Sequence, residues 1–438
     1  MIMKLSEKLS VFLGKSISVI STKLRFGAGA TWPGEIALRI SPHILSVLGK
    51  QFKKGIILIV GTNGKTTTSL MIRTILSYEG YEVITNDSGA NLLNGLVSAC
   101  IKKGIGMDRS SAEWGVFEVD ENSLPIILRY ISPKMIVLLN LFRDQLDRYG
   151  EVDIIAEKWG IALKKISQDT TLVCNADDPL IASIAKKTGK SSVYFGLSIK
   201  TVQDAGIDHA TDSIFCMNCG SRLSYANYYF SHLGEWFCKG CGEKRPKLTL
   251  DSWESPLPGL YNEYNTMAAA LTVLKLGIQP RHIKEALIDF IPAFGRQEEQ
   301  IVDEKKVKIL LSKNPAGFNA SLRTALDMKP KVLLLALNDR IPDGRDVSWI
   351  WDVDFEMIPA DCKIIVSGDR VYDMALRIEY SATGYKRLET RKMIVEPDLK
   401  KAINKGLETI LRGETYYILA TYSAMLDIRK IIIGRKIL

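Results

Sequence analysis

The chain has 438 residues, of which 46% are hydrophobic and 24% charged, the balance of a soluble globular protein. This length exceeds one ordinary core and predicts two or three domains. No apolar run reaches the roughly 18 residues that span a bilayer, and Lys4, Lys8 and Lys15 interrupt the apolar segment that a signal peptide needs. We therefore expect a cytoplasmic protein whose seven cysteines are reduced.

The net charge of +9 is compatible with an anionic ligand such as ATP, an acidic membrane surface or nucleic acid, and the charge by itself does not choose among them. Within an N-terminal segment of residues 1–50, residues 5 to 24 have the pattern of an amphipathic helix. We expect its apolar face to pack against the rest of the protein in preference to a membrane. That face comprises Leu5, Leu9, Phe12, Leu13, Ile17, Ile20 and Leu24.

A buried-strand pattern, Ile56 to Val60, runs directly into a glycine-punctuated turn and a helix. Glycines let consecutive backbone N–H groups wrap a phosphate, and the helix directs its positive end toward it. Lys65 can reach terminal phosphates and Thr66 can ligate Mg²⁺. The spacing is shorter than the general P-loop pattern, and a plain strand-turn-helix is the alternative, but the context favours ATP. The turn reads Gly61-Thr62-Asn63-Gly64-Lys65-Thr66-Thr67.

Apolar runs then alternate with helical patterns, which predicts a mostly parallel α/β sheet over residues 51–298 and a second, Rossmann-like α/β domain over 299–438. The two should meet near Phe294-Gly295-Arg296. The strands of the first are expected at 56–60, 81–85, 115–119, 135–140, 171–174 and 192–195, and those of the second at 307–312, 331–337, 363–367, 393–395 and 415–420.

Residues 203 to 250 differ in composition and have the character of an insertion. Their cysteines have the spacing C-x2-C-x18-C-x2-C, which lets four thiolates converge on a tetrahedral Zn²⁺. A closed shell of four thiolates leaves no open position, so this zinc ribbon would be structural. Because it interrupts an ATPase domain, a spacer or docking role is favoured over nucleic-acid binding. The predicted ligands are Cys216, Cys219, Cys238 and Cys241.

At this point the chain resembles the Mur ligases, which activate a carboxylate as an acyl phosphate. Besides the P-loop, the matching segments lie in the family's order. They are Phe117-Glu118-Val-Asp-Glu121, Asn140-Leu-Phe-Arg-Asp144-Gln-Leu-Asp147, Asn175-Ala-Asp-Asp-Pro179, Pro258-Gly-Leu-Tyr-Asn262-Glu-Tyr-Asn265 and Phe294-Gly-Arg296-Gln-Glu298. The fold that this resemblance implies is a Mur-ligase-like P-loop domain.

The resemblance also implies roles for single residues. Glu118, at a strand end, would hold Mg²⁺ against the phosphates, the alternative being a solvated acid. Asn262 and Asn265 lie three apart on a helix and would be near the nucleotide base, the alternative being helix capping.

Asn140, Asp144 and Asp147 could orient metal, water or adenine. Here Arg143-Asp144-Gln145 replaces the Asp-His of many members, a departure from the family pattern. Arg296, at the domain junction, would meet a phosphate when the domains close, and a structural salt bridge is its alternative.

The four-cysteine insertion and the segment Asn338 to Asp352 are similar to the MurT branch of the family. That resemblance implies ATP-dependent amidation of the α-carboxylate of D-glutamate in the lipid II stem peptide, at the inner membrane surface, with ammonia from a GatD-like glutaminase in a heterodimer. It also implies that Asp346, or else Asp352, completes the glutaminase's Cys-His pair as a catalytic aspartate. The alternative is a polar turn. The competing functions are a self-sufficient Mur-type or folylpolyglutamate-like ligase, and a zinc-ribbon ATPase that binds nucleic acid.

Overall fold

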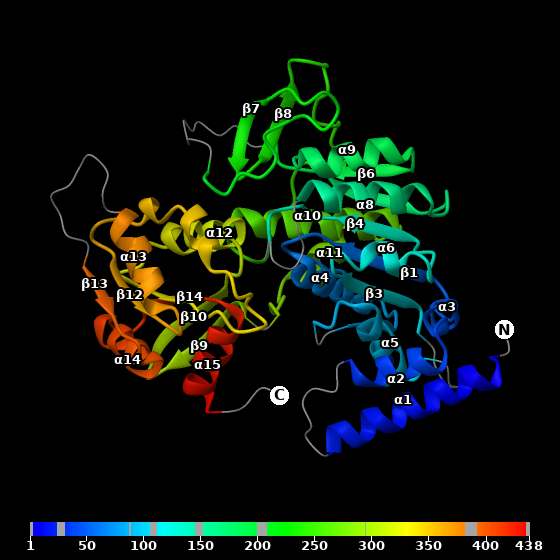
Figure 1. Cartoon of the computed structure of the whole chain (residues 1–438), viewed down its shortest axis with the longest axis horizontal. Coiled ribbons are helices and arrows are strands. Elements are labelled where there is room, and N and C mark those ends of the chain that lie inside the picture. Colours follow the sequence, from blue (N-terminus) through cyan, green and yellow to red (C-terminus); the bar gives the residue numbers. More distant parts are fainter. Residues whose placement is uncertain are drawn as a thin grey trace.

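The computed structural model describes residues 3–23, 31–86, 89–105, 112–144, 152–198, 208–293, 295–381 and 392–434. Two α/β units lie side by side, each built on a six-stranded sheet, and a two-stranded hairpin projects from the first (Figure 1). None of the described helices is long and apolar enough to cross a membrane.

The first sheet is entirely parallel, with strand order β2-β3-β1-β4-β5-β6. Its central strands are continuous apolar runs because helices cover both faces. The strands are β1 (Gly55–Val60), β2 (Val83–Thr85), β3 (Trp114–Val119), β4 (Met135–Leu138), β5 (Thr171–Asn175) and β6 (Ser192–Phe195). The helices are α4 (Lys65–Tyr78), α5 (Leu93–Lys102), α6 (Leu124–Ile127), α8 (Val152–Lys164), α9 (Pro179–Thr188), α10 (Leu260–Lys275) and α11 (Pro280–Leu287).

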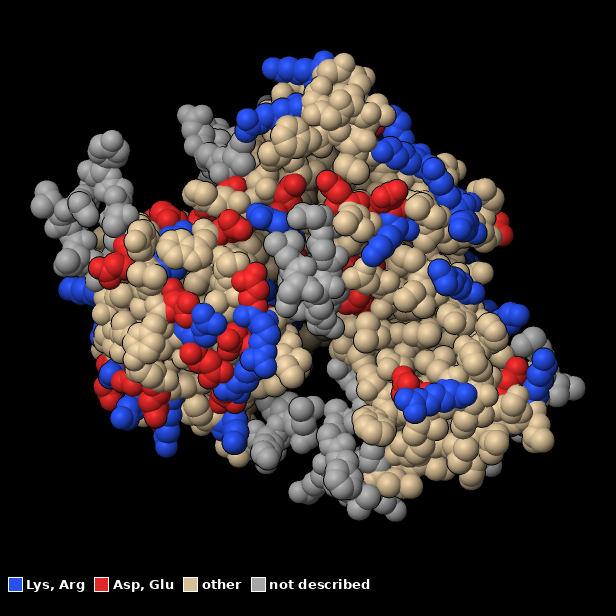
Figure 2. Space-filling view, viewed as in Figure 1, with Lys and Arg blue, Asp and Glu red and all other residues tan. Residues whose placement is uncertain are grey.

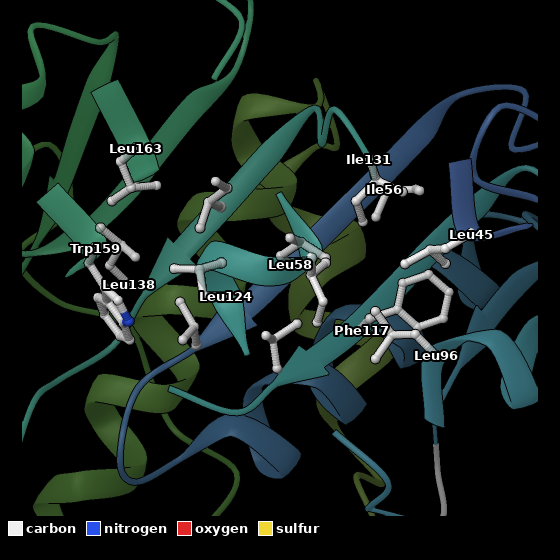
Figure 3. Close-up of a cluster of buried hydrophobic side chains, with 14 of the residues drawn as sticks. Leu45, Ile56, Leu58, Leu96, Phe117, Leu124, Ile131, Leu138, Trp159 and Leu163 are labelled. Carbon is white, nitrogen blue, oxygen red and sulfur yellow. The ribbon is translucent and has the colours of Figure 1, made fainter. Parts of the chain in front are cut away.

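Alternate residues of β1 supply the cores on the two faces of this sheet. Ile56 and Leu58 belong to the cluster shown in Figure 3, where Phe117, Leu138 and Trp159 lie beside them. The alternate residues, Ile57 and Ile59, pack on the other face against α4 and α10. This double burial fixes β1 in the middle of the sheet, so the turn that follows it opens at the centre of the carboxyl edge.

The second sheet has the order β13-β12-β11-β14-β10-β9 and is parallel except for the edge strand β9. We did not predict β9, whose mostly polar sequence lacks the apolar pattern of the other strands. Its strands are β9 (Arg296–Val302), β10 (Lys305–Leu311), β11 (Val332–Ala336), β12 (Lys363–Ser367), β13 (Met393–Val395) and β14 (Thr415–Ala420). The helices are α12 (Pro315–Asp327), η1 (Ser348–Asp352), η2 (Phe355–Met357), α13 (Val371–Ser381), α14 (Leu399–Thr409) and α15 (Tyr422–Ile433).

The insertion contains the antiparallel hairpin β7 (Leu223–Phe230) and β8 (Leu233–Cys238). At the other end of the first unit lie α1 (Leu5–Lys23), α2 (Trp32–Ile40) and α3 (Ile44–Gly49).

Our prediction for the packed face of α1 was wrong. The helix packs against α2 and α5, but of the predicted face Leu5, Leu9, Phe12 and Ile20 are exposed, and only Leu13 and Ile17 are half-buried. Gly14 faces inward instead: a Cβ there would lie 2.9 Å from Ile101 Cδ1. The side of α1 that carries small residues therefore packs against the neighbouring helices, because these helices approach closely. Leu24 of the predicted face lies outside the described residues.

Candidate functional site

The turn after β1 has the backbone of a phosphate-binding loop. Gly61 and Gly64 have φ values of +148° and +90°, which only glycine adopts readily. A Cβ on Gly64 would lie 2.0 Å from Asn265 Oδ1, so there is no room for another residue. Gly64 caps α4, whose free N–H groups and positive end face the loop.

The strand order brings residues from three strands to this loop. Because β1 lies between the parallel strands β3 and β4, the carboxyl ends of all three meet here. Glu118 of β3 accepts a hydrogen bond from Thr66 Oγ1 at 2.7 Å. Asn140, just after β4, accepts from Asn63 N at 2.9 Å and donates to Asn63 O at 3.1 Å. The Thr66 hydroxyl and Glu118 carboxylate are oxygen ligands of the kind that Mg²⁺ takes.

Lys65 forms an ion pair with Glu121, an acid to which we assigned no role from the sequence. Its Nζ lies 3.1 Å from Glu121 Oε1 and donates to Gly61 O at 2.5 Å. Both side chains are buried. Burial raises the pKa of Glu121, and the Lys65 charge opposes that rise. The loop lysine is thus preorganised in a dry site, where its charge acts more strongly than in water.

The two asparagines of α10 are not helix caps. Gly259 occupies the cap position, and Asn262 Nδ2 donates to Pro258 O at 2.7 Å. Asn265 Nδ2 donates to Asn262 Oδ1 at 3.2 Å; both residues are buried, and Asn265 lies beside Gly64. Their contact with a nucleotide stays a prediction.

Arg296 lies at the start of β9, where the two units meet. Within the described part of the chain no carboxylate lies within ion-pair distance of it, so the salt-bridge alternative finds no support. Burial lowers the pKa of Arg296, and Glu118 and Asp144 oppose that shift. A partly buried guanidinium with no bound carboxylate is suited to an anionic ligand.

The second unit contributes two residues that we did not predict. Lys313 Nζ, just after β10, lies 2.5 Å from Asp144 Oδ2. Burial acts to lower the pKa of Lys313, but the carboxylates of Asp144 and Glu121 outweigh it and raise that pKa. The Asn314 side chain exchanges hydrogen bonds with that of Asn63 at 3.1 and 3.3 Å. A Lys-Asn pair following a buried strand was the signal available in the sequence.

One cleft lies between the two units, with an empty volume of about 790 Å³ that includes open solvent at its mouth. Ligand pockets are of this order. Of the residues described above, it is lined by Asn63, Gly64, Asn140, Asn262, Asn265, Arg296 and Lys313. The polar wall comes from the loop, Arg296 and Lys313, and an apolar wall includes Phe142, Phe230 and Tyr264. The cleft can therefore hold a polyanion at one end and an aromatic group at the other.

The four cysteines of the insertion converge. Their sulfur atoms all lie within 4.8 Å of one another, with 3.7 Å between Cys216 and Cys241 and 3.4 Å between Cys219 and Cys238. A tetrahedral Zn²⁺ with Zn–S bonds of about 2.3 Å holds its sulfurs about 3.8 Å apart. Disulfide sulfurs would be in direct bonding contact at about 2 Å. The donor set and spacing therefore fit a structural zinc ion.

The insertion also contacts the second unit. Asp208 receives two hydrogen bonds from Arg323 of α12, at 2.5 and 3.0 Å. His209 Nδ1 lies 2.5 Å from Asp354 Oδ1. Arg143 pairs with Asp212 of the insertion. The described insertion thus joins the two walls of the cleft from one side.

The two aspartates considered for a partner differ in their surroundings. Asp346 is exposed, and its Oδ1 accepts a hydrogen bond from Ser348 N at 2.8 Å. Asp352 instead lies 3.4 Å from Arg143 in an ion pair that crosses between the units. Asp346 is therefore the more available of the two. Asp147 and Gln145 lie outside the described residues.

Comparison with known proteins gives the family. Residues 59–273 match the Mur ligase middle domain and residues 311–425 the MurT ligase C-terminal domain. The chain is 33% identical over 99% of its length, and 99% of the relative's, to a lipid II isoglutaminyl synthase subunit MurT from Streptococcus pneumoniae (strain ATCC BAA-255 / R6). The corresponding Staphylococcus aureus (strain COL) subunit is also 33% identical, over 92% of this chain and 91% of the relative.

Solved structures support the same fold. The pseudomurein peptide ligase type C from Methanothermus fervidus superposes with a TM-score of 0.65 at 22% identity, over 89% of this chain and 80% of that one. MurF from Acinetobacter baumannii gives a TM-score of 0.60 at 17% identity, over 90% and 80%. With the loop, the interdomain cleft and the full-length similarity together, the chain belongs to the MurT family of the Mur ligases.

Proposed function

We propose that this chain is the ATP-dependent synthetase subunit of a lipid II amidotransferase in peptidoglycan synthesis. It converts the α-carboxylate of D-glutamate in the stem peptide to the carboxamide, at the inner face of the membrane, using ammonia from a GatD-like glutaminase. The observation that carries the proposal is that P-loop residues and two cations at the domain junction, Arg296 and Lys313, line one cleft in a chain that is similar to a MurT subunit over 99% of its length.

The proposed reaction begins with activation of the acceptor carboxylate. A carboxylate oxygen of the acceptor attacks the γ-phosphorus of ATP, which forms an acyl phosphate and releases ADP. Lys65, Arg296 and Lys313 neutralise the phosphoryl oxygens as charge moves between them. Thr66 and Glu118 would hold Mg²⁺, which would supply further neutralisation of the phosphates.

Ammonia then attacks the acyl carbon, inorganic phosphate leaves with the bonding electron pair, and the new amide loses a proton. Asp346 serves the partner: it is exposed and has no ion-pair partner among the described residues, so it can orient a histidine of the glutaminase.

The alternatives find less support. Residues 208–250, which form the described insertion, contain five basic and four acidic side chains. The net charge of +9 is therefore not concentrated on the insertion, as a nucleic-acid-binding ribbon would need. The decisive assay gives the purified heterodimer ATP, glutamine and lipid II and analyses the product by mass spectrometry. We expect ADP and a carboxamide in equal amounts. A product that carries an added amino acid would instead establish a peptide ligase.

A further inference from the structure

The N-terminal helix α1 packs in an unusual orientation. Its inward side carries Ser10, Val11, Gly14 and Ser18, all buried, whereas large apolar side chains face outward. The exposed fractions are 85% for Leu5, 49% for Leu9, 60% for Phe12, 49% for Val19 and 55% for Ile20. We call these five residues the α1 stripe.

Helical geometry places the stripe on one side of the helix, where Ser16 also falls. At about 100° per residue, the five side chains fall within an arc of roughly 100°, and the opposite side of the helix is centred on Gly14. Lys4, Lys8 and Lys15 all lie along one border of this arc by the same rule. Figure 2 shows few charged side chains over α1 and α2, at the lower right of the molecule.

The neighbouring helix adds an aromatic group. Trp32, the first residue of α2, is 69% exposed. Indole rings concentrate where an apolar phase meets water, because the ring is apolar and its N–H is a donor. An apolar stripe, a border of lysines and an adjacent tryptophan are the features of a helix that lies in the plane of a membrane interface.

We infer that α1 is the membrane-docking helix of this protein, with its stripe inserted among the acyl chains of an anionic bilayer and its lysines on the lipid headgroups. The inference rests on the proposed function in one respect: the acceptor is attached to a lipid, so docking would keep the cleft near its substrate. Because none of the described helices can span a membrane, α1 lies on the surface.

Flotation with vesicles tests this without any substrate. The full-length chain in complex with its glutaminase is mixed with vesicles of phosphatidylglycerol and phosphatidylcholine, or of phosphatidylcholine alone. We expect binding to the anionic vesicles that weakens with salt. The double variant Leu9→Ser with Phe12→Ser should partition at least about tenfold less, since two apolar side chains no longer insert. Lys4→Gln with Lys8→Gln should remove much of the preference for anionic vesicles.

The matched control is Ile301→Ser with Leu411→Ser, which removes two exposed apolar side chains (74% and 66%) from the second unit. It should float like the wild type. Equal flotation of the stripe variant and the control would overturn the inference. So would a stripe variant that loses self-association or glutaminase binding in size-exclusion chromatography, because a protein would then cover the stripe.

Amidation assays separate this inference from the proposed function. If α1 docks the enzyme, the stripe variant should keep wild-type turnover with detergent-solubilised lipid II and lose it with lipid II in vesicles. Vesicle binding by a wild-type complex that amidates neither form would support docking and reject the proposed function. Full vesicle turnover by the stripe variant would reject docking.

Discussion

At the scale of single residues, the site is an array of cations held apart from bulk water. Lys65 and Lys313 are each paired with an acid, Glu121 or Asp144, whereas Arg296 has no carboxylate at ion-pair distance in the described structure. Paired lysines are fixed in place before a nucleotide arrives. Arg296 is therefore the cation whose charge a bound phosphate would be the first group to neutralise.

The first prediction concerns Lys65. Because Lys65 is buried with Glu121, Lys65→Ala also leaves a buried acid without its partner. ATP turnover should fall at least about 100-fold, with a loss of up to about 3 kcal/mol in stability. Adding Glu121→Gln should restore the melting temperature without restoring turnover. Recovery of turnover in the double variant would contradict the role of Lys65.

The second prediction concerns Asp346. Asp346→Asn keeps an oxygen that can accept the hydrogen bond from Ser348 N, so the turn should persist and only the charge is lost. Glutamine-driven amidation should fall by about 10⁴-fold, and amidation driven by ammonium chloride should continue. The control, Asp352→Asn, breaks the ion pair with Arg143 and should spare glutamine hydrolysis. Equal loss with both nitrogen sources would refute the assignment.

At the scale of elements, the insertion has two tasks. Its cysteines close the far end of the β7-β8 hairpin, and its Asp208, His209 and Asp212 contact the cleft walls. A two-stranded hairpin is marginal in water without further support. A metal bound by the cysteines at one end would therefore stabilise the contacts at the other.

The third prediction follows. The protein should contain one zinc ion per chain, and Cys216→Ser with Cys241→Ser should abolish it by elemental analysis. Proteolysis should then cut the insertion faster, while α4 and the first sheet remain protected. The matched variant Cys100→Ser with Cys362→Ser removes two cysteines outside the cluster and should keep the metal. Zinc retained in the first variant would rule out these ligands.

The fourth prediction is a pH dependence at His209. Its hydrogen bond with Asp354 raises the pKa of His209, and that of a free histidine is about 6.5. A raised folded-state pKa means that the contact is fully present below pH 6.5 and is lost as pH rises through the higher value. The melting temperature should decline slightly over that window in the wild type and less in His209→Gln. The effect is small because the imidazole is 68% exposed. An equal decline of the melting temperature in the wild type and in His209→Gln would show that the contact does not contribute to stability.

At the scale of the whole molecule, catalysis depends on how the two units sit together. The loop belongs to one unit and Lys313 to the other, so the charge array exists only when they are docked. Contacts from the insertion to α12 lie on one side of the cleft.

The fifth prediction tests this docking. Arg323→Ala removes both hydrogen bonds to Asp208, which should loosen the units and raise the KM for ATP several-fold with little change in melting temperature. Small-angle scattering should show a larger radius of gyration. Arg412→Ala breaks an exposed ion pair with Glu304 inside the second unit and should change neither quantity. Identical scattering and KM for the two variants would mean that Asp208 does not hold the units together.

Local patterns predicted much of this molecule. The buried strands of both sheets were expected from apolar runs, and β7, β8 and β9 were not, because they are polar or half-exposed. The loop glycines and the cysteine spacing were equally visible, since turn chemistry and ligand spacing act over a few residues.

Only the tertiary structure decided which side chains face one another. Asn63 and Asn314 are 251 residues apart and meet through domain docking, which no local pattern encodes. The outward face of α1 is a second case, because helix periodicity defines an apolar stripe but not which side the neighbouring helices approach. The chain's sequence thus determined most strands of its two large sheets, the glycine turn after β1 and the spacing of its four clustered cysteines. Strand order and docking determined the charge array and the exposed stripe, because both depend on contacts between distant segments.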